Sequence, residues 1–442
     1  MNNWWQETED RELLENRRWF EGDESRLEYF FKKEYNQFKQ GQNSPYEVLN
    51  LQRKFWKNVG GKIPRVHSGL PKLITKTKVN LITSNGFDVE GDETAVARLW
   101  EILETNDFSK VWQGVETDVS WAGRGLFRIY HDFGDVVPSV EKVSPESFKI
   151  LVNRGKVYGI EFSSRKDEVE IIEKLELEDG KVAIEYKKII HELNNSYEVP
   201  LDEEFGEYLT ELPFLPFELV NNTVVNSRFP ESYYGESDYT GVQSLFQTLD
   251  ALISHAQLEI TNAKAIKFVN ERVVKKDQDG NGVWDENEIT IELANKEMEN
   301  FDVDKQIKLF QPNIRVAEYD KLSNDTKAQV LAIVGISPVS TGLPGFESIT
   351  ASASSQRERE KASIRTRQEA LERRRTIFNR FFNKLLKYDD FINGRPIGDY
   401  EFNVLFSEWS IPTLDDKIDT IGKALQSGAM DTLTAVQEVF PD

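Results

Sequence analysis

Acidic and amide side chains alternate along one short segment in the spacing of a calcium-binding loop. Residues 277–288 fit the pattern D-x-D-x-N-G-x-x-x-x-x-E at every defined position. Ca²⁺ takes oxygen ligands from carboxylates, amides and backbone carbonyls, and the glycine allows the sharp turn that gathers them. The predicted ligands are the side chains of Asp277, Asp279, Asn281, Asp285 and Glu288 and the carbonyl of Val283.

The residues beside this loop favour a second interpretation. A calcium-binding loop of this kind usually lies between two helices, whereas residues 268–274 and 289–293 have the β-branched, alternating pattern of strands. Asp279-Gly280 and Asn281-Gly282 are also strong signals for a hairpin turn. The segment is therefore either a Ca²⁺ site or the polar tip of a hairpin, and both interpretations stay open.

No other pattern in the chain indicates catalysis. The sequence has no H-E-x-x-H, no G-x-x-x-x-G-K-[ST] and no G-x-S-x-G, and Gly123-Arg124-Gly125 lacks the third glycine of a dinucleotide site. The histidines are scattered and are expected to be surface or packed residues: His67, His131, His191 and His255. We therefore expect a protein that is not an enzyme and that needs no cofactor other than Ca²⁺.

Composition narrows the class of protein further. The chain has 442 residues, 39% of them hydrophobic, with no cysteine and a net charge of −21. Disulfides and thiolate metal sites are excluded, and the acidic balance argues against a conventional nucleic-acid-binding module, which is basic on one face. The first residues lack the pattern of a signal peptide, and no apolar run approaches the ~18 residues of a membrane span.

Periodicity predicts an α+β fold in which long helices follow a strand-rich region. The first 75 residues are expected to be mostly helical with a break at Gly22, and residues 85–225 to form short strands interrupted by one helix at 94–104. Ser237 or Asp238 is predicted to cap the next helix, which carries an apolar stripe from Val242 to Ala256.

The C-terminal half alternates helices with loops. A helix is predicted at 316–334, then a loop at 335–346 rich in glycine, proline and serine, then a helix at 348–388. Apolar residues recur every seven positions in this last helix and predict a long packing seam: Ile364, Leu371, Phe378 and Leu385. A strand at 401–406 and a helical hairpin at 414–440 are expected to close the chain.

Several of these segments together resemble the portal proteins of tailed bacteriophages. The resemblance lies in VGISP (334–338), SITASA (348–353) and QREREK (356–361), with LPFLPF (212–217), GESDY (235–239) and VSWAGRG (119–125) upstream. It extends from about Trp19 to Pro441 and depends on the order and spacing of the motifs.

The resemblance implies a portal-type fold with named parts. It assigns 1–236 and 350–415 to a wing, 237–268 and 315–335 to two stem helices, 269–314 to a small α/β clip, 336–349 to a tunnel loop, and 416–442 to a short helical crown. The tunnel-loop residues expected to face DNA are Ser340, Thr341, Gly342, Leu343, Pro344 and Gly345.

The resemblance also implies partners and a location. We expect a homo-oligomeric ring of twelve subunits at the capsid vertex, assembled in the host cytoplasm, with no membrane contact. Double-stranded DNA would be packaged and ejected through its channel. The other expected partners are the terminase large subunit, a head–tail adaptor, and the major capsid and scaffold proteins.

The basic residues allow two placements. Arg373, Arg374 and Arg375 lie in the most basic helix of the chain and are expected to pair with acids of a neighbouring subunit rather than with DNA. Lys264 and Lys267 are alternative DNA-facing residues. Two rival functions remain: a calcium-stabilised structural or adhesion protein, and a metal-dependent hydrolase that uses the acidic residues.

Overall fold

A computed structural model describes residues 4–39, 54–57, 65–132, 134–191, 196–199, 208–262, 266–269, 307–310, 315–343 and 353–407. It confirms the α+β class. The chain divides into two compact units, the first made of 1–21, 71–240 and 331–442 and the second of 22–70 and 241–330. Residues 22–70 therefore group with 241–330 rather than with the rest of 1–236. The wing, stem, clip, tunnel-loop and crown boundaries stay a prediction.

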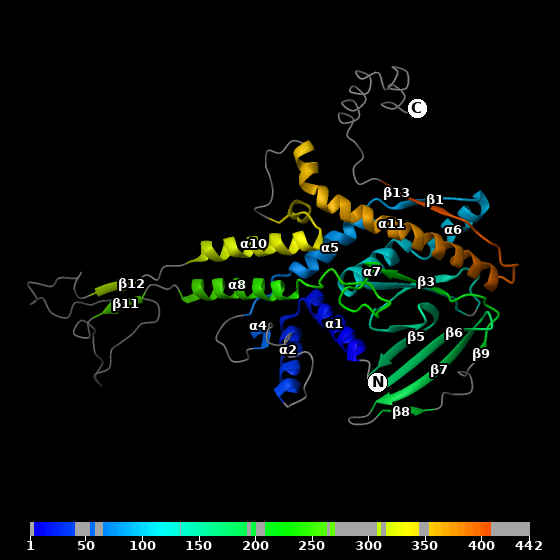
Figure 1. The fold of residues 1–442 in the computed structure, drawn as a ribbon, viewed down its shortest axis with the longest axis horizontal. Helices are drawn as coiled ribbons and strands as arrows, with labels where there is room; N and C mark the ends of the chain where they lie inside the picture. Colours follow the sequence, from blue (N-terminus) through cyan, green and yellow to red (C-terminus); the bar gives the residue numbers. More distant parts are fainter. Residues whose placement is uncertain are drawn as a thin grey trace, which may run out of the picture. The chain divides into compact units, whose positions relative to one another are not determined.

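The first unit contains several helices (Figure 1). They are α1 (Trp4–Glu21), α5 (Leu70–Thr83), α6 (Glu93–Thr105), α7 (Phe108–Ala122), the short η2 (Pro338–Thr341) and α11 (Ala353–Ile392). The expected break after α1 is confirmed, because α1 ends at Glu21 and Gly22 has φ +68°. The helix expected at 94–104 is α6, and Asp92 caps it by accepting hydrogen bonds from the Thr94 and Ala95 N–H groups.

Among the described residues of the first unit, the strands form three antiparallel sheets. The smallest joins β1 (Phe87–Glu90) to β13 (Asn403–Phe406), and a second has the order β10 (Phe217–Asn221), β2 (Arg124–Tyr130), β3 (Ser139–Val143). The largest runs β4 (Phe148–Asn153), β5 (Lys156–Lys166), β6 (Val169–Glu178), β7 (Lys181–His191), β8 (Ser196–Val199), with β9 (Tyr208–Leu209) also on β7.

The core of the first unit lies where α11 meets α7 and the sheets. Leu371, Phe378 and Leu385 are buried in it, which confirms three of the four positions of the predicted seam. The first position, Ile364, is only half-buried and lies outside this core. The ring of Phe378 packs against those of Phe87 and Trp112 at centroid distances of 5.3 and 5.4 Å. Figure 1 shows α11 in orange running beside the β1–β13 ribbon.

The second unit contains paired helices and a two-stranded ribbon. Its elements are α2 (Glu24–Lys39), α4 (Lys54–Lys57), α8 (Gln243–Asn262), α10 (Val316–Val334, whose last turn belongs to the first unit), β11 (Ile266–Val269) and β12 (Ile307–Phe310). Figure 1 shows α8 and α10 side by side, and Glu259 of α8 accepts a hydrogen bond from the Tyr319 hydroxyl of α10 at 3.2 Å. Asp250 of α8 accepts bonds from Trp56 Nε1 and the Ser68 N–H and lies 2.9 Å from His67 Nδ1.

Two sequence-based expectations were wrong. Residues 108–122 form α7, a second helix inside the region expected to be strands apart from 94–104. Ser237 and Asp238 do not cap α8, which begins at Gln243. Instead, the Ser237 hydroxyl donates to the Trp121 carbonyl and Asp238 lies beside Lys78, so both side chains belong to a buried contact with α7 and α5. The hairpin expected at 414–440 lies outside the described residues.

Candidate functional site

The segment predicted as the start of the tunnel loop begins with a tight helix ending. After α10, Gly335 has φ +76°, its N–H donates to the Ala332 carbonyl, and the Ile336 N–H donates to the Leu331 carbonyl. These two bonds form a Schellman motif, which is usually accompanied by an apolar contact between the residues at Leu331 and Ile336. Both side chains are buried, so the chain leaves α10 in a fixed direction.

Hydroxyl groups of α11 then fix the turn in place. Ser363 Oγ accepts a hydrogen bond from the Ser337 N–H at 2.8 Å and lies 2.9 Å from Ser340 Oγ. Thr366 Oγ1 donates to the Gly335 carbonyl at 2.7 Å. We call Ser337, Ser340, Ser363 and Thr366 the hydroxyl cluster. It joins residues 335–340 to the first half of α11 through short side chains that have few rotamers.

The predicted DNA-facing residues are only partly described. Ser340 and Thr341 lie in η2, where the Thr341 hydroxyl donates to the Pro338 carbonyl at 2.6 Å. Gly342, with φ +65°, ends η2, and the Leu343 N–H donates to Thr341 Oγ1. Pro344 and Gly345 lie outside the described residues. Contact of these residues with DNA stays a prediction, although the Ser340 hydroxyl is already engaged with α11.

One turn further along α11, Arg367 connects three segments of the first unit. Its Nε donates to the Leu81 carbonyl at the end of α5 and its Nη2 donates to the Ser407 carbonyl after β13, both at 2.7 Å. Burial lowers the pKa of Arg367 from its ordinary value. The part of α11 that carries Ser363 and Thr366 of the hydroxyl cluster is therefore bonded through Arg367 to α5 and to the residue after β13.

Arg374, the middle residue of the run 373–375 that was predicted to pair between subunits, is buried inside its own subunit. Arg374 is 0% exposed and makes a bidentate ion pair with Glu116 of α7, at 2.6 and 3.0 Å. Trp112 Nε1 also donates to Glu116, and Arg374 Nη1 donates to the Asn221 carbonyl. The expectation of intersubunit pairing is therefore wrong for Arg374, because a closer acid on α7 satisfies it.

The flanking arginines differ from Arg374. Arg375 is partly exposed and pairs with Glu372 one turn back on the same helix at 3.4 Å. The Nε of Arg373 is buried without a hydrogen-bond partner among the described residues. Burial, with Arg374 alongside, lowers the pKa of Arg373. Intersubunit pairing of Arg373 and Arg375 stays a prediction.

The rest of the basic helix mostly faces acids of the same unit. Arg380 and Lys384 both pair with Glu218 of β10, at 2.6 and 2.8 Å. Arg98 of α6 makes the reverse contact by donating to Asp389 near the end of α11. The local excess of basic residues is thus largely explained by packing within the subunit.

Two motifs that are far apart in the sequence meet in a buried polar network. The Asn222 N–H donates to the Gly123 carbonyl, and the Asp238 N–H donates to the Ser120 carbonyl. Lys78 of α5 donates to Asp238 at 2.5 Å and to Asn222 at 2.9 Å. A Cβ on Gly123, which has φ +80°, would lie 2.4 Å from the Gly235 carbonyl. VSWAGRG and GESDY therefore form one junction.

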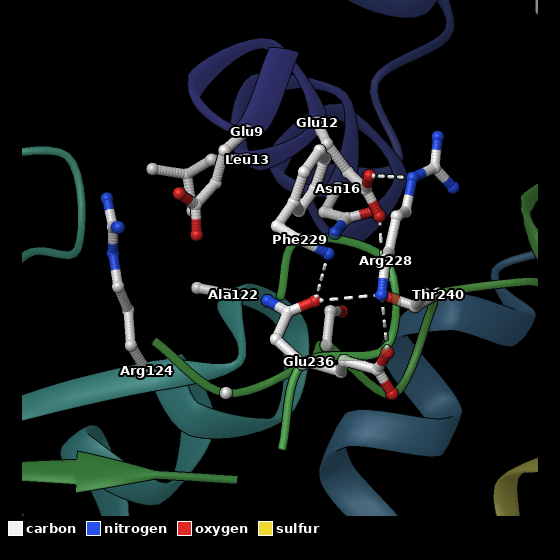
Figure 2. A pocket seen from close by; sticks show the side chains of 13 residues that line it. Glu9, Glu12, Leu13, Asn16, Ala122, Arg124, Arg228, Phe229, Glu236 and Thr240 are labelled. Atoms are coloured by element: carbon white, nitrogen blue, oxygen red, sulfur yellow. Dashed lines mark hydrogen bonds and ion pairs between the residues drawn. The ribbon is translucent and has the colours of Figure 1, made fainter. Parts of the chain in front are cut away.

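Helix α1 packs on the loop that leads to α8, around a small charged cavity (Figure 2). Glu12 lies 2.7 Å from Arg228 Nε and accepts a hydrogen bond from the Thr240 hydroxyl at 3.3 Å. Within the loop, Glu236 accepts a hydrogen bond from the Arg228 N–H, as Figure 2 shows. Asn226 accepts one from the Phe229 N–H. The cavity, of about 30 Å³, has room for little more than water.

The remaining predicted site residues contribute little here. The calcium-loop residues and Lys264 lie outside the described residues, and Lys267 lies in β11 opposite Leu309. Among the described residues, no group of three or more histidines or acids is placed to hold a metal ion. In the same part of the chain, no helix is long and apolar enough to cross a membrane.

One comparison with known proteins shows the family of the chain. Residues 6–441 match the family described as phage portal protein, SPP1 Gp6-like. No curated protein is similar enough in sequence to be matched. Similar solved structures include a chain from the neck of an empty GTA particle computed with C6 symmetry, at 10% identity and a TM-score of 0.50, which covers 90% of this chain and 93% of that one.

Two further chains come from native particles of the same kind. One is from a neck computed with C12 symmetry, with 10% identity, a TM-score of 0.49 and coverage of 89% of this chain and 93% of that one. The other is from the virion of a gene transfer agent, with 11% identity, a TM-score of 0.48 and coverage of 86% and 96%. At such identities, likeness of structure concerns the fold alone.

Proposed function

Because the chain belongs to the SPP1 Gp6-like family of phage portal proteins, we propose that it is one subunit of a ring at the capsid vertex, with DNA passing through the ring's channel. The observation that carries this proposal is the family match over residues 6–441, nearly the whole chain. We infer a structural role without catalysis. Cyclic symmetry of the kind named for the GTA necks is compatible with the ring.

The geometry supports a role for residues 335–343 in that channel. The Schellman motif fixes the backbone of residues 331–336, and the hydroxyl cluster holds residues 335–340 against α11. A rigid support is what a loop needs if it must touch a moving ligand without displacing its subunit. We propose that residues 340–345 face the DNA and that Ser337 and Ser363 hold their base.

The proposed partners follow from that role. They are double-stranded DNA, the terminase large subunit during packaging, the head–tail adaptor afterwards, and the major capsid and scaffold proteins at the vertex. A twelve-subunit ring is the expected stoichiometry. A net charge of −21 is compatible with a channel that lets DNA slide, because tightly held phosphates would slow it.

Electron microscopy of the purified full chain tests the ring directly. We expect closed rings with a central channel and no hydrolytic turnover of nucleotides or esters. Monomer alone, even at high concentration and with scaffold protein added, together with metal-dependent turnover, would favour the hydrolase instead. A Leu343→Trp variant should form normal rings but package DNA more slowly, and unchanged packaging would remove residues 340–345 from the channel.

We also propose a Ca²⁺ site in residues 277–288, which rests on the sequence pattern alone. Calorimetric titration of the full chain with CaCl₂ should give heat that is lost in Asp277→Ala and in Glu288→Ala. The matched control is Asp325→Ala, which removes an exposed carboxylate of α10 and should bind Ca²⁺ as the wild type does. Equal heat in all proteins would mean that the segment is only a hairpin tip.

A further inference from the structure

The first unit contains a large groove beside the free edge of its largest sheet. The groove has a volume of about 920 Å³, and its walls come from α1, β4, β5, β6 and residues 230–234. Strand β4 pairs only with β5 among the described residues, so this wall is the edge of the sheet. Nothing in the proposed ring function assigns a role to this groove.

Large apolar side chains are exposed inside it. Leu14 is 41% exposed, Val152 37%, Tyr158 38% and Tyr233 43%. Single exposed apolar residues are ordinary on a protein surface, but several gathered in one hollow mark a contact site. The groove therefore has the apolar surface that a bound segment would cover.

The charge of the groove is strongly one-sided. Its lining includes six carboxylates and two basic side chains. Asp10 and Glu231 are exposed, and neither has an ion-pair partner in the described part of the chain. A ligand that is complementary to this surface carries positive charge.

The floor of the groove holds one buried cation, Arg124, whose charge acts on Glu9 and Tyr234. Arg124 is 5% exposed, and its guanidinium lies 3.8 Å from the ring centroid of Tyr234. Its Nη2 donates to the Pro145 carbonyl at 2.9 Å. Its buried Nε has no hydrogen-bond partner among the described residues, so the floor keeps one unused donor next to aromatic rings.

Side chains rather than strand addition must provide the recognition. In an antiparallel pair alternate residues turn their backbone groups outward, and the outward N–H of Ile150 already donates to the Tyr234 hydroxyl at 2.8 Å. This contact blocks the middle of the β4 edge, as proteins commonly do to prevent unwanted pairing. The recognisable features that remain are apolar pockets and carboxylates.

We propose that this groove binds a basic segment with apolar side chains from another protein. A second copy of the chain is a poorer source, because several of its basic side chains already pair with acids of the same subunit. Examples are Arg128 with Glu173, Arg374 with Glu116, and Lys384 with Glu218. The acidic balance of the whole chain points the same way.

The test uses the full chain and labelled short peptides in which lysine alternates with leucine or tyrosine. Fluorescence anisotropy should show binding that weakens with salt. The double variant Asp10→Asn, Glu231→Gln should lower the affinity by about tenfold, and Leu14→Ser should lower it at every salt concentration. Peptides with glutamate in place of lysine, or with glycine in place of the apolar residues, should not bind.

A matched control separates the groove from the general acidity of the chain. Glu104→Gln, Glu178→Gln removes two exposed carboxylates that do not line the groove and should leave peptide affinity unchanged. An equal loss in both double variants, or no binding at all, would overturn the proposal. Loss of self-association in Asp10→Asn, Glu231→Gln without peptide binding would point to a second copy and overturn it too. If rings are seen by microscopy but the peptides do not bind, the groove proposal is refuted and the proposed ring function is not.

Discussion

Glu116 of α7 and Arg374 of α11 form an ion pair that is buried inside the first unit. Both carboxylate oxygens accept from Arg374, and Trp112 adds a third donor to Glu116. A buried pair offsets its desolvation only when its geometry and hydrogen bonds are this complete. Arg374 is thus a fixed part of the joint between α7 and α11, whereas a run of three arginines in a sequence suggests an exposed surface.

Removing one member of this pair should be costly. Arg374→Met leaves Glu116 buried without its counter-charge, and the expected loss is about 3–5 kcal/mol in the free energy of unfolding. The double variant Glu116→Leu, Arg374→Met should recover most of it, because no charge stays buried. Urea unfolding followed by tryptophan fluorescence measures both. A single variant as stable as the wild type would show that the pair contributes little.

The turn after α10 makes a second residue-level prediction. Gly335 has φ +76°, and a Cβ there would lie 2.6 Å from Thr366 Oγ1. Gly335→Ala should therefore cost about 1–2 kcal/mol for the left-handed backbone alone, with more from the contact. Hydrogen exchange at the Ile336 amide should become faster. In a Thr366→Ala background the contact is relieved, so the same substitution should cost less; an equal cost would place the strain elsewhere.

Sequence alone identified some residues of this site and missed others for a physical reason. The glycine and serine content of 335–346 correctly marked a turn between helices, because such residues break helices locally. The hydroxyl cluster was missed, since Ser337 and Ser363 are 26 positions apart and meet only because residues 337–341 pack against α11. Ser237 and Asp238 were predicted to be caps because the local sequence does not show their buried partners, which lie on α5 and α7 more than 100 positions away.

At the level of elements, periodicity succeeded where one face of a helix is clearly apolar. The seven-residue repeat of α11 correctly predicted the buried Leu371, Phe378 and Leu385. Helix α7 was missed although Phe108, Trp112, Val115 and Val119 recur at spacings of four and three, because the surrounding strands dominated the interpretation. Its C-terminal Gly123, with φ +80°, was a further signal of a helix end.

Helix α1 gives a prediction about pH. Burial raises the pKa of Glu9 above its ordinary 4.5, although Ser232 and Arg124 partly oppose this. Because the folded chain holds this proton more tightly, the stability from Glu9 is complete below the unfolded pKa and is lost as pH rises through the folded value.

Glu9→Gln should remove that loss. We expect the variant to melt at a higher temperature than the wild type at pH 7 and the difference to shrink toward pH 4. Calorimetric melting curves at several pH values measure it. Glu104→Gln, an exposed carboxylate on α6 that is not among the charges acting on Glu9, is the control and should show no such trend. A difference that is constant with pH would mean that Glu9 acts through packing rather than through its proton.

On the scale of the whole molecule, several basic side chains of this acidic chain form ion pairs with acids of the chain itself. Arg98, Lys78, Lys384 and Arg374 all pair with acids of the first unit. The α+β class and the family could be predicted from the sequence, because helix and strand patterns and motif order are local properties. The placing of each cation could not, since it depends on which distant acid the fold brings near.

Arg373 has no ion-pair partner among the described residues, and with the partly exposed Arg375 it can distinguish subunit contact from DNA contact. Burial lowers the pKa of Arg373, and its Nε has no hydrogen-bond partner in the described residues, so an acid from a neighbouring subunit would stabilise it. We expect Arg373→Gln, Arg375→Gln to weaken ring assembly, with rings dissociating at lower salt than the wild type. Light scattering across a salt series measures this.

Arg365→Gln, an exposed residue paired with Glu369 on the same helix, is the matched control and should assemble normally. If rings form unchanged but the salt dependence of DNA binding becomes shallower, the two arginines face the phosphates instead.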